Sequence, residues 1–198
     1  MTPRARSLAA LAELAQRDAL SDARWAHCGA LALEAYGVFD GESELMVVAD
    51  RPLPDDVQPQ VATRDGQRWT PAGGASIVWR ARQDHFAPLF QAAIESATSR
   101  PSQARAERAT TSPAVVSPAI VSPATVSGPA LAALLLQRRD ESPTLLQVLM
   151  AGSVDFDEAR AFTCTHLGPY ALDDLENVMQ EAEWLLMRQR YTDKNGLN

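Results

Sequence analysis

Residues 27–49, HCGALALEAYGVFDGESELMVVA, contain the two signals that decide the fold. The first is a short apolar helix pattern over residues 30–35, and Gly37 is suited to end it because glycine readily adopts the left-handed conformation of a helix C-cap. The second is the segment of residues 44–49, which is apolar after Glu44 and predicts a buried strand after a turn. A helix followed at once by a buried strand predicts an α/β arrangement.

The patterns on both sides extend this α/β unit. Leu8, Leu11 and Leu14 recur at helical spacing and predict a first helix over about residues 6–19. Residues 24–27 fit either a short strand or the first turn of the next helix. Downstream, the sequence predicts a hairpin over residues 61–69, a strand over residues 76–82 and a helix over residues 85–96.

The segment of residues 100–129 differs in composition from the rest of the chain. A Ser-Pro-Ala unit begins at Ser112 and recurs at Ser117 and Ser122. Proline at this density prevents a helix and disrupts a central strand, so an extended linker is expected. The alternative of a ligand for a proline-reading module is less favoured, because the repeat has no aromatic or basic anchor.

The chain after the linker is expected to be entirely helical. Gly128-Pro129 suits a helix start, since proline is favoured at the first helical position. The predicted organisation is an α/β part over residues 1–99, a linker over residues 100–129 and a helical part over residues 130–198. Within the helical part, helices are predicted over residues 131–137, 144–150, 155–165 and 173–191.

The charge of the chain limits its partners. The net charge is -7, and Lys194 is the only lysine among 18 basic residues. Non-specific nucleic-acid affinity comes mainly from lysine and arginine, so no extended nucleic-acid surface is expected. Residues 51–108 nevertheless hold eight arginines against six acidic residues, which leaves room for a local anion site.

The cysteines and the apolar runs exclude other classes of protein. Cys28 and Cys164 lie far apart without a CxxC spacing, which indicates neither a zinc site nor a disulfide framework. The longest apolar run, residues 130–136, is far too short for a membrane span. We therefore expect a soluble cytoplasmic protein without a membrane partner.

Residues 27–49 resemble the opening of the small nucleotidyltransferase-fold proteins, a group that includes antitoxins. Those proteins have a Gly-Gly or Gly-Ser turn, a helix with Ala-Leu and Tyr/His-Gly, and a strand that opens with Asp-x-Asp. Short segments of the helical part are similar as well, namely Val126-Ser127, residues 131–139, Val154-Asp155 and Leu167-Gly168. The resemblance implies a small mixed sheet with flanking helices, followed by a C-terminal helical part.

The resemblance also shows where this chain departs from the family. Gly29 takes the second position of the turn, and Asp-x-Asp falls on Glu44-Leu45-Met46. Two carboxylates at positions i and i+2 share one face of a strand, where they hold the metal ions that bind nucleotide phosphates. The Met46 thioether is too soft a ligand for Mg²⁺. The resemblance therefore implies an inactive site and a protein that binds or regulates.

Further residues are expected to line the groove between the sheet and the helical part. The family pattern places a third carboxylate on the later strand, but residues 76–82 contain none and Asp84 lies just beyond them. The helical part should supply lysine, and this chain has arginine instead. The candidates for nucleotide binding are Gly29, Arg80, Arg82, Arg138 and Arg139.

Two alternatives remain open. One is a divergent nucleotidyltransferase that uses Mg²⁺ held by Glu44, Asp50 and Asp84, which must then converge. The other is an α/β protein-interaction module without any relation to that family. In the leading interpretation no cofactor is needed and the expected partner is a protein, because the acid-rich helical part would repel phosphate. A nucleotide remains a possible ligand.

Overall fold

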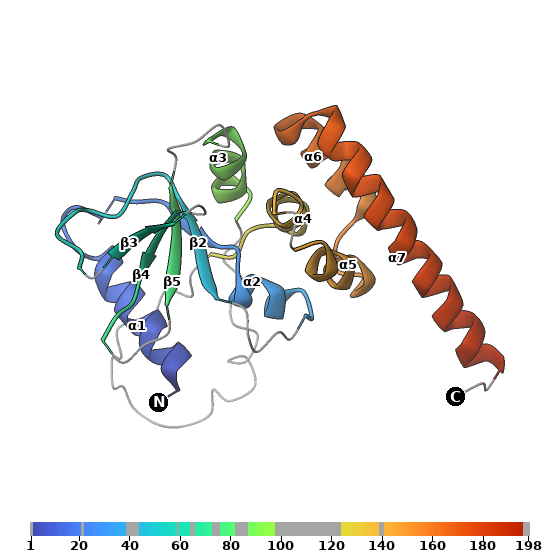
Figure 1. Cartoon of the computed structure of the whole chain (residues 1–198), viewed down its shortest axis with the longest axis horizontal. Coiled ribbons are helices and arrows are strands. Elements are labelled where there is room, and N and C mark those ends of the chain that lie inside the picture. The colour runs from blue at the N-terminus through green and yellow to red at the C-terminus, as the bar shows by residue number, and fades with distance from the viewer. Residues whose placement is uncertain are drawn as a thin grey trace, which may run out of the picture.

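The computed structural model describes residues 2–20, 22–38, 44–58, 60–63, 66–72, 76–81, 87–97, 124–138 and 141–195. These residues form a mixed sheet with flanking helices, followed by a helical part, so the expected fold class is confirmed (Figure 1). The strands are β1 (Trp25–His27), β2 (Leu45–Ala49), β3 (Gln60–Thr63), β4 (Gly66–Trp69) and β5 (Ile77–Ala81). The helices are α1 (Pro3–Ala15), α2 (Ala30–Ala35), α3 (Ala87–Glu95), α4 (Gly128–Leu136), α5 (Ser142–Met150), α6 (Phe156–Leu167) and α7 (Pro169–Asn195).

The sheet has the strand order β1-β2-β5-β4-β3. The two apolar strands β2 and β5 lie side by side in parallel at its centre, with Met46 opposite Val78. The hairpin expected over residues 61–69 is formed by β3 and β4, which pair antiparallel. Residues 24–27 contain a strand rather than a helical turn, because β1 pairs antiparallel with the edge of β2.

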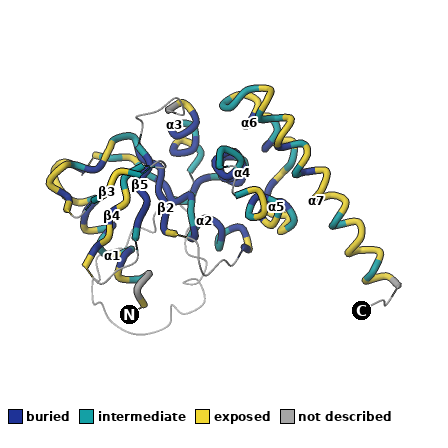
Figure 2. Tube along the Cα trace, viewed as in Figure 1, coloured by how far each residue is buried: buried dark blue, intermediate teal, exposed yellow. Residues whose placement is uncertain are grey.

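Helices cover both faces of the sheet. Side chains alternate along a strand, so Met46, Val48 and Val78 face one core and Leu45 and Ile77 face the other. The first core lies under α2, α3 and α4, and the second lies under α1. Figure 2 shows the buried residues concentrated along β2, β5 and α4, between the two ends of the molecule.

The end of the expected linker is part of the fold. The His27 amide donates to the Ala124 carbonyl at 2.9 Å, and the Val126 amide donates to the His27 carbonyl at 3.0 Å. Residues 124–126 therefore lie along the free edge of β1, and Val126 is completely buried. The Ser127 side chain then accepts from the Ala130 amide and caps α4. Apart from Ala124, the last residue of the third unit, the Ser-Pro-Ala repeats lie outside the described residues.

The helical part is built around α4. This helix is buried on nearly every side, because it packs against the sheet-side helix α3 and against α5, α6 and α7. One apolar core runs from Met46 and Val78 in the sheet through Leu131 to Leu149 and Met179. No described helix combines the length and the apolar character needed to cross a lipid bilayer.

Candidate functional site

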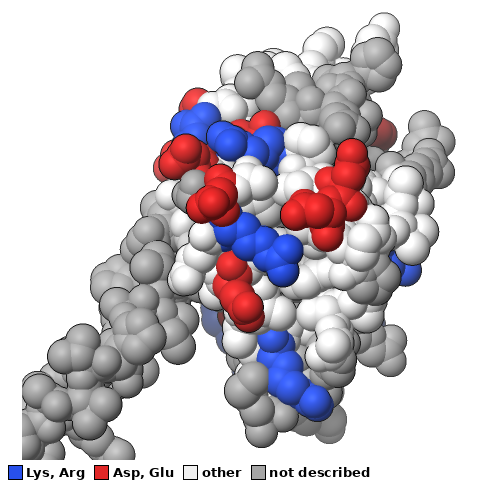
Figure 3. Space-filling view, turned by 90° about the vertical axis from the view of Figure 1, so that its left-hand side faces the viewer, with Lys and Arg blue, Asp and Glu red and all other residues white. Residues whose placement is uncertain are grey.

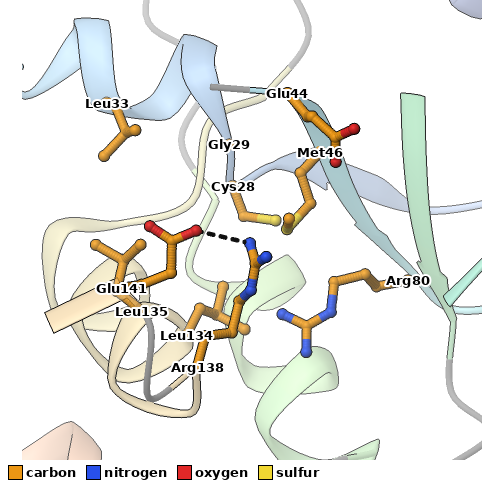
Figure 4. Close-up of a pocket in the computed structure, with 10 residues that line it drawn as sticks. All are labelled: Cys28, Gly29, Leu33, Glu44, Met46, Arg80, Leu134, Leu135, Arg138 and Glu141. Atoms are coloured by element: carbon orange, nitrogen blue, oxygen red, sulfur yellow. Dashed lines mark ion pairs between the residues drawn. The ribbon is translucent and has the colours of Figure 1, made fainter. Parts of the chain in front are cut away.

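A cavity of about 240 Å³ lies where the sheet meets α4 (Figure 4). Four of the residues selected from the sequence line it: Gly29, Glu44, Arg80 and Arg138. They come from the turn before α2, from the start of β2, from β5 and from the end of α4. The remaining lining residues are Cys28, Leu33, Met46, Leu134, Leu135 and Glu141.

Gly29 joins α2 to β2 through close backbone contact. The Cys28 amide donates to the Met46 carbonyl at 3.0 Å, and the Ala30 amide donates to the Glu44 carbonyl at 3.1 Å. A Cβ atom on Gly29 would lie 2.5 Å from the Glu44 carbonyl oxygen and 2.7 Å from the Met46 amide nitrogen. Only glycine allows the two segments to approach so closely. This wall of the cavity is therefore fixed by the backbone.

Two sulfur-containing side chains form the inner wall. Cys28 and Met46 are buried, and Figure 4 shows their sulfur atoms beside each other. Burial raises the pKa of the Cys28 thiol to about 12, although the nearby charges of Arg80 and Arg138 act in the opposite direction. The thiol is consequently neutral at physiological pH, and this wall is weakly polar.

Glu44, which directly precedes β2, contributes a carboxylate to the cavity. It forms an ion pair with Arg68 of β4, at 2.9 Å between the Arg68 guanidinium and the carboxylate. In Figure 4 it lies across the cavity from the Arg138–Glu141 pair. At position i+2, Met46 presents a thioether to the cavity.

These residues do not fit a magnesium ion. Mg²⁺ requires several oxygen ligands in near-octahedral geometry, and thioether and thiol groups are poor substitutes. Within the part of the chain that the structure describes, no group of three or more His, Cys, Asp or Glu residues is placed to hold a metal ion.

Two arginines face the cavity from opposite sides. Arg80 is 5% exposed, and its Nη2 donates to the Gln137 side-chain oxygen at 2.8 Å. Its guanidinium carbon lies 4.7 Å from the centre of the Phe90 ring, in cation–π contact. Arg138 forms an ion pair with Glu141 at 3.0 Å. Figure 4 shows both guanidinium groups pointing into the cavity.

The other residues selected from the sequence are not part of this site. Asp50 follows β2 at the end opposite Glu44, about 20 Å away at the usual rise of a strand. There its carboxylate accepts from the Arg24 amide at 3.2 Å. The structure therefore does not bring Asp50 and Glu44 together. Arg82, Asp84 and Arg139 lie outside the described residues.

The sequence did not point to several residues that complete the site. Arg68 neutralises Glu44 from the edge hairpin, and Gln137 and Phe90 orient Arg80. These contacts depend on how distant elements pack, so no local pattern predicts them. Glu141 differs from these residues, because it lies only three positions after Arg138, its ion-pair partner, between α4 and α5.

In comparisons with known proteins, no family model, no curated protein and no solved structure matches the chain. The resemblance to nucleotidyltransferase-fold proteins therefore rests on the short motifs around Gly29 and Glu44 and on those of the helical part. The functional conclusion depends on the cavity residues and their contacts.

We expect only one of the two cysteines to react with a thiol reagent in the folded protein. Cys164 is exposed, whereas Cys28 is buried with a raised pKa. Because the thiolate is the reactive form, a chromogenic disulfide reagent at about pH 8 should modify Cys164 alone in buffer and both cysteines in denaturant. A Cys164→Ser variant is the control, and rapid reaction of its folded form would contradict the burial of Cys28.

The same thiol should make stability fall in alkaline solution. The pKa of Cys28 is raised from 9.0 to about 12 in the folded state, so the folded state retains this proton to higher pH than the unfolded state does. Its contribution is fully present below about pH 9 and is lost as the pH rises from about 9 to 12. Urea unfolding across this range should show a decline that Cys28→Ala reduces.

Proposed function

We propose that this chain is a non-catalytic binding protein on a nucleotidyltransferase-like scaffold, and that its cavity binds an anionic group without a metal ion. The observation that carries this proposal is the pair of guanidinium groups, those of Arg80 and Arg138, that point into a cavity. Its lining also includes Met46 and Glu44, and Glu44 is paired with Arg68. A cation on the protein takes the part that a metal ion plays in a nucleotidyltransferase.

The chemistry of the cavity argues against group transfer. Metal-assisted transfer needs carboxylates that hold the ions and a group that activates the attacking hydroxyl. Glu44 is paired with Arg68, and the neutral thiol of Cys28 is neither a base nor a metal ligand at physiological pH. The transferase alternative also requires Glu44 and Asp50 to converge, and they lie at opposite ends of β2.

The same features favour anion binding. Arg80 is buried, so its interaction with an anion is less weakened by water than it would be on the surface. Gln137 and Phe90 hold its guanidinium in place before a ligand arrives, which lowers the entropy cost of binding. Arg138 can exchange the Glu141 carboxylate for a ligand oxygen, because that pair is part of the cavity wall.

The surface favours a small ligand or a protein over a nucleic acid. Figure 3 shows Lys and Arg interspersed with Asp and Glu on the face that includes β3, β4 and α1, without a continuous basic stripe. Residues 141–183 hold nine acidic residues against Arg160 alone. A polyanion would be repelled there, whereas a single phosphate or carboxylate group can reach the cavity.

Thermal unfolding in the presence of nucleotides tests the proposal. Millimolar pyrophosphate or nucleoside triphosphate should raise the unfolding midpoint by about 4 °C, and Mg²⁺ should not be required. Arg80→Met and Arg138→Met keep most of the side-chain volume and should each remove the shift. Arg17→Met, which changes an exposed arginine on the turn after α1, should leave the shift unchanged.

The result separates the alternatives. A shift that requires Mg²⁺ and disappears in Glu44→Ala would overturn the metal-free proposal and support a divergent transferase, which an assay of nucleotide transfer would then examine. Equal stability with and without every anion would overturn anion binding. The nucleotidyltransferase-like scaffold would then be assigned to protein binding alone.

A further inference from the structure

The C-terminal helix α7 runs past the rest of the molecule. Its buried residues Leu175, Met179 and Ala182 recur at helical spacing and pack against α5 and α6. Among the described side chains, Ala182 is the last buried residue of α7. Residues 183–195 then continue for about 20 Å at the rise of an α-helix, and Figure 1 shows this end projecting from the body.

The projecting end carries an apolar stripe on its outward face. Trp184, Met187 and Tyr191 are 54%, 62% and 68% exposed. At about 100° per residue these three side chains lie within one narrow sector of the helix, opposite the sector of Ala182. Their i, i+3, i+7 spacing is that of a coiled-coil seam. We call these three residues the α7 stripe.

The charges around the α7 stripe are ordered along the helix. The first part of α7 is acidic, and the last part is mainly basic. A reversed copy of the same helix, centred near the stripe, would place Glu183 beside Arg190 of the other copy. The acidic residues of the first part are Asp173, Asp174, Glu176, Glu181 and Glu183, and the last part holds Arg188, Arg190 and Lys194 together with Asp193.

We propose that α7 pairs antiparallel with α7 of a second copy of this chain, across a two-fold axis at Met187. In this arrangement Trp184 of one copy contacts Tyr191 of the other, and the two Met187 side chains meet on the axis. Glu183 and Arg190 lie on the same flank of the stripe. In an antiparallel pair, this flank of one helix faces the same flank of the other helix. Each Glu183 therefore lies within one residue of the level of Arg190 in the other copy.

We assign a second copy of the chain as the partner of the α7 stripe because the stripe is complementary to itself. A two-fold interface uses the same surface on both partners, so each favourable contact occurs twice. Both the seam and the Glu183–Arg190 pair satisfy this condition without another molecule. The proposal goes beyond the proposed function, since the cavity lies at β2, β5 and α4 and shares no residue with the α7 stripe.

The dimer should be weak and reversible. A large side chain buries on the order of 150 Å² in full contact, so two stripes remove several hundred Å² from water. A standard stable interface buries about 1,600 Å². We therefore expect a dissociation constant on the order of 10–100 µM, which sedimentation velocity of the full chain can measure.

Substitutions on α7 test the interface directly. The double variant Trp184→Glu/Met187→Glu should weaken association at least about tenfold and leave the unfolding midpoint within error, since both residues are exposed. Gln189→Glu adds one negative charge to the exposed surface of α7 outside the stripe and should associate almost as the natural chain does. Glu183→Arg should weaken association, and adding Arg190→Glu should restore it.

Cysteine cross-linking tests the orientation. In a Cys164→Ser background, Met187→Cys should form a disulfide-linked dimer under mild oxidation. Trp184→Cys should not, because its two copies would be offset by about 9 Å along the helices, beyond the reach of a disulfide. Equal cross-linking of both variants would overturn the antiparallel arrangement. Self-pairing would be overturned if the chain stayed monomeric up to about 500 µM. It would also be overturned if the Trp184→Glu/Met187→Glu variant associated as strongly as the natural chain. The stripe would then be assigned to contact with a different protein.

Discussion

Replacing Gly29 by alanine should destabilise the protein by about 4 kcal/mol, a large effect for a single methyl group. The added Cβ would lie 2.5 Å from the Glu44 carbonyl oxygen and 2.7 Å from the Met46 amide nitrogen. Both are backbone atoms, so no change of side-chain rotamer relieves the overlap. The turn must move away from β2, which breaks the hydrogen bonds of the Cys28 and Ala30 amides. Urea unfolding followed by circular dichroism measures the loss.

Gly152→Ala is the matched control for this prediction. A Cβ on Gly152 would meet nothing within 4 Å, but its φ of +70° lies in the left-handed region. This substitution should lower the free energy of unfolding by only about 1 kcal/mol, which is the penalty that a residue with a side chain has in the left-handed conformation. If the two variants lost equal stability, the close approach of Gly29 to β2 would not be a structural requirement. The cavity wall would then be free to move.

Leu131→Ala should destabilise the protein by about 3 kcal/mol, and the whole chain should respond. Leu131 is fully buried in α4, at the centre of the core that joins the sheet to the helical part. Removing its side chain loses burial free energy and leaves a cavity that surrounding helices cannot easily fill. Because the core is shared, we expect one unfolding transition at a lower urea concentration.

Two spectroscopic probes distinguish a shared core from independent halves. In a Trp184→Phe background the remaining tryptophans, Trp25, Trp69 and Trp79, report on the sheet. Circular dichroism at the helical band reports on the helices. Both signals should change together in Leu131→Ala. Leu136→Ala removes the same kind of side chain from the half-buried end of α4. It should destabilise the protein less than Leu131→Ala does, by roughly 1 kcal/mol or more. Separate transitions would show that the parts fold independently.

Local patterns in the sequence were sufficient for most of the elements. Three patterns predicted elements that the structure contains: the helical spacing of Leu8, Leu11 and Leu14, the strand pattern at residues 44–49 and the hairpin pattern at residues 61–69. The ends were less accurate. The last helix begins at Pro169, earlier than the expected residue 173, because proline is well suited to the first turn of a helix.

The residue types that the start of β2 places on one face were also visible in the sequence. Positions i and i+2 of a strand share a face whatever the strand pairs with, so Glu44 and Met46 necessarily present one carboxylate and one thioether together. For the same reason Asp50 could not join Glu44, since an extended strand keeps its two ends apart. These conclusions need only the geometry of one strand.

Tertiary structure alone decided which charges meet. The pairing of β4 with β5 brings Arg68 to Glu44, and the packing of α4 over the sheet brings Gln137 to Arg80. Sheet register and helix packing depend on the fit of whole apolar faces, and no window of sequence contains both partners of such a contact. The sequence by itself therefore determined most of the elements and the residue types on each face of β2. The folded chain determined the arginine-lined cavity, the place of residues 124–126 beside β1, and the point at which α7 leaves the core.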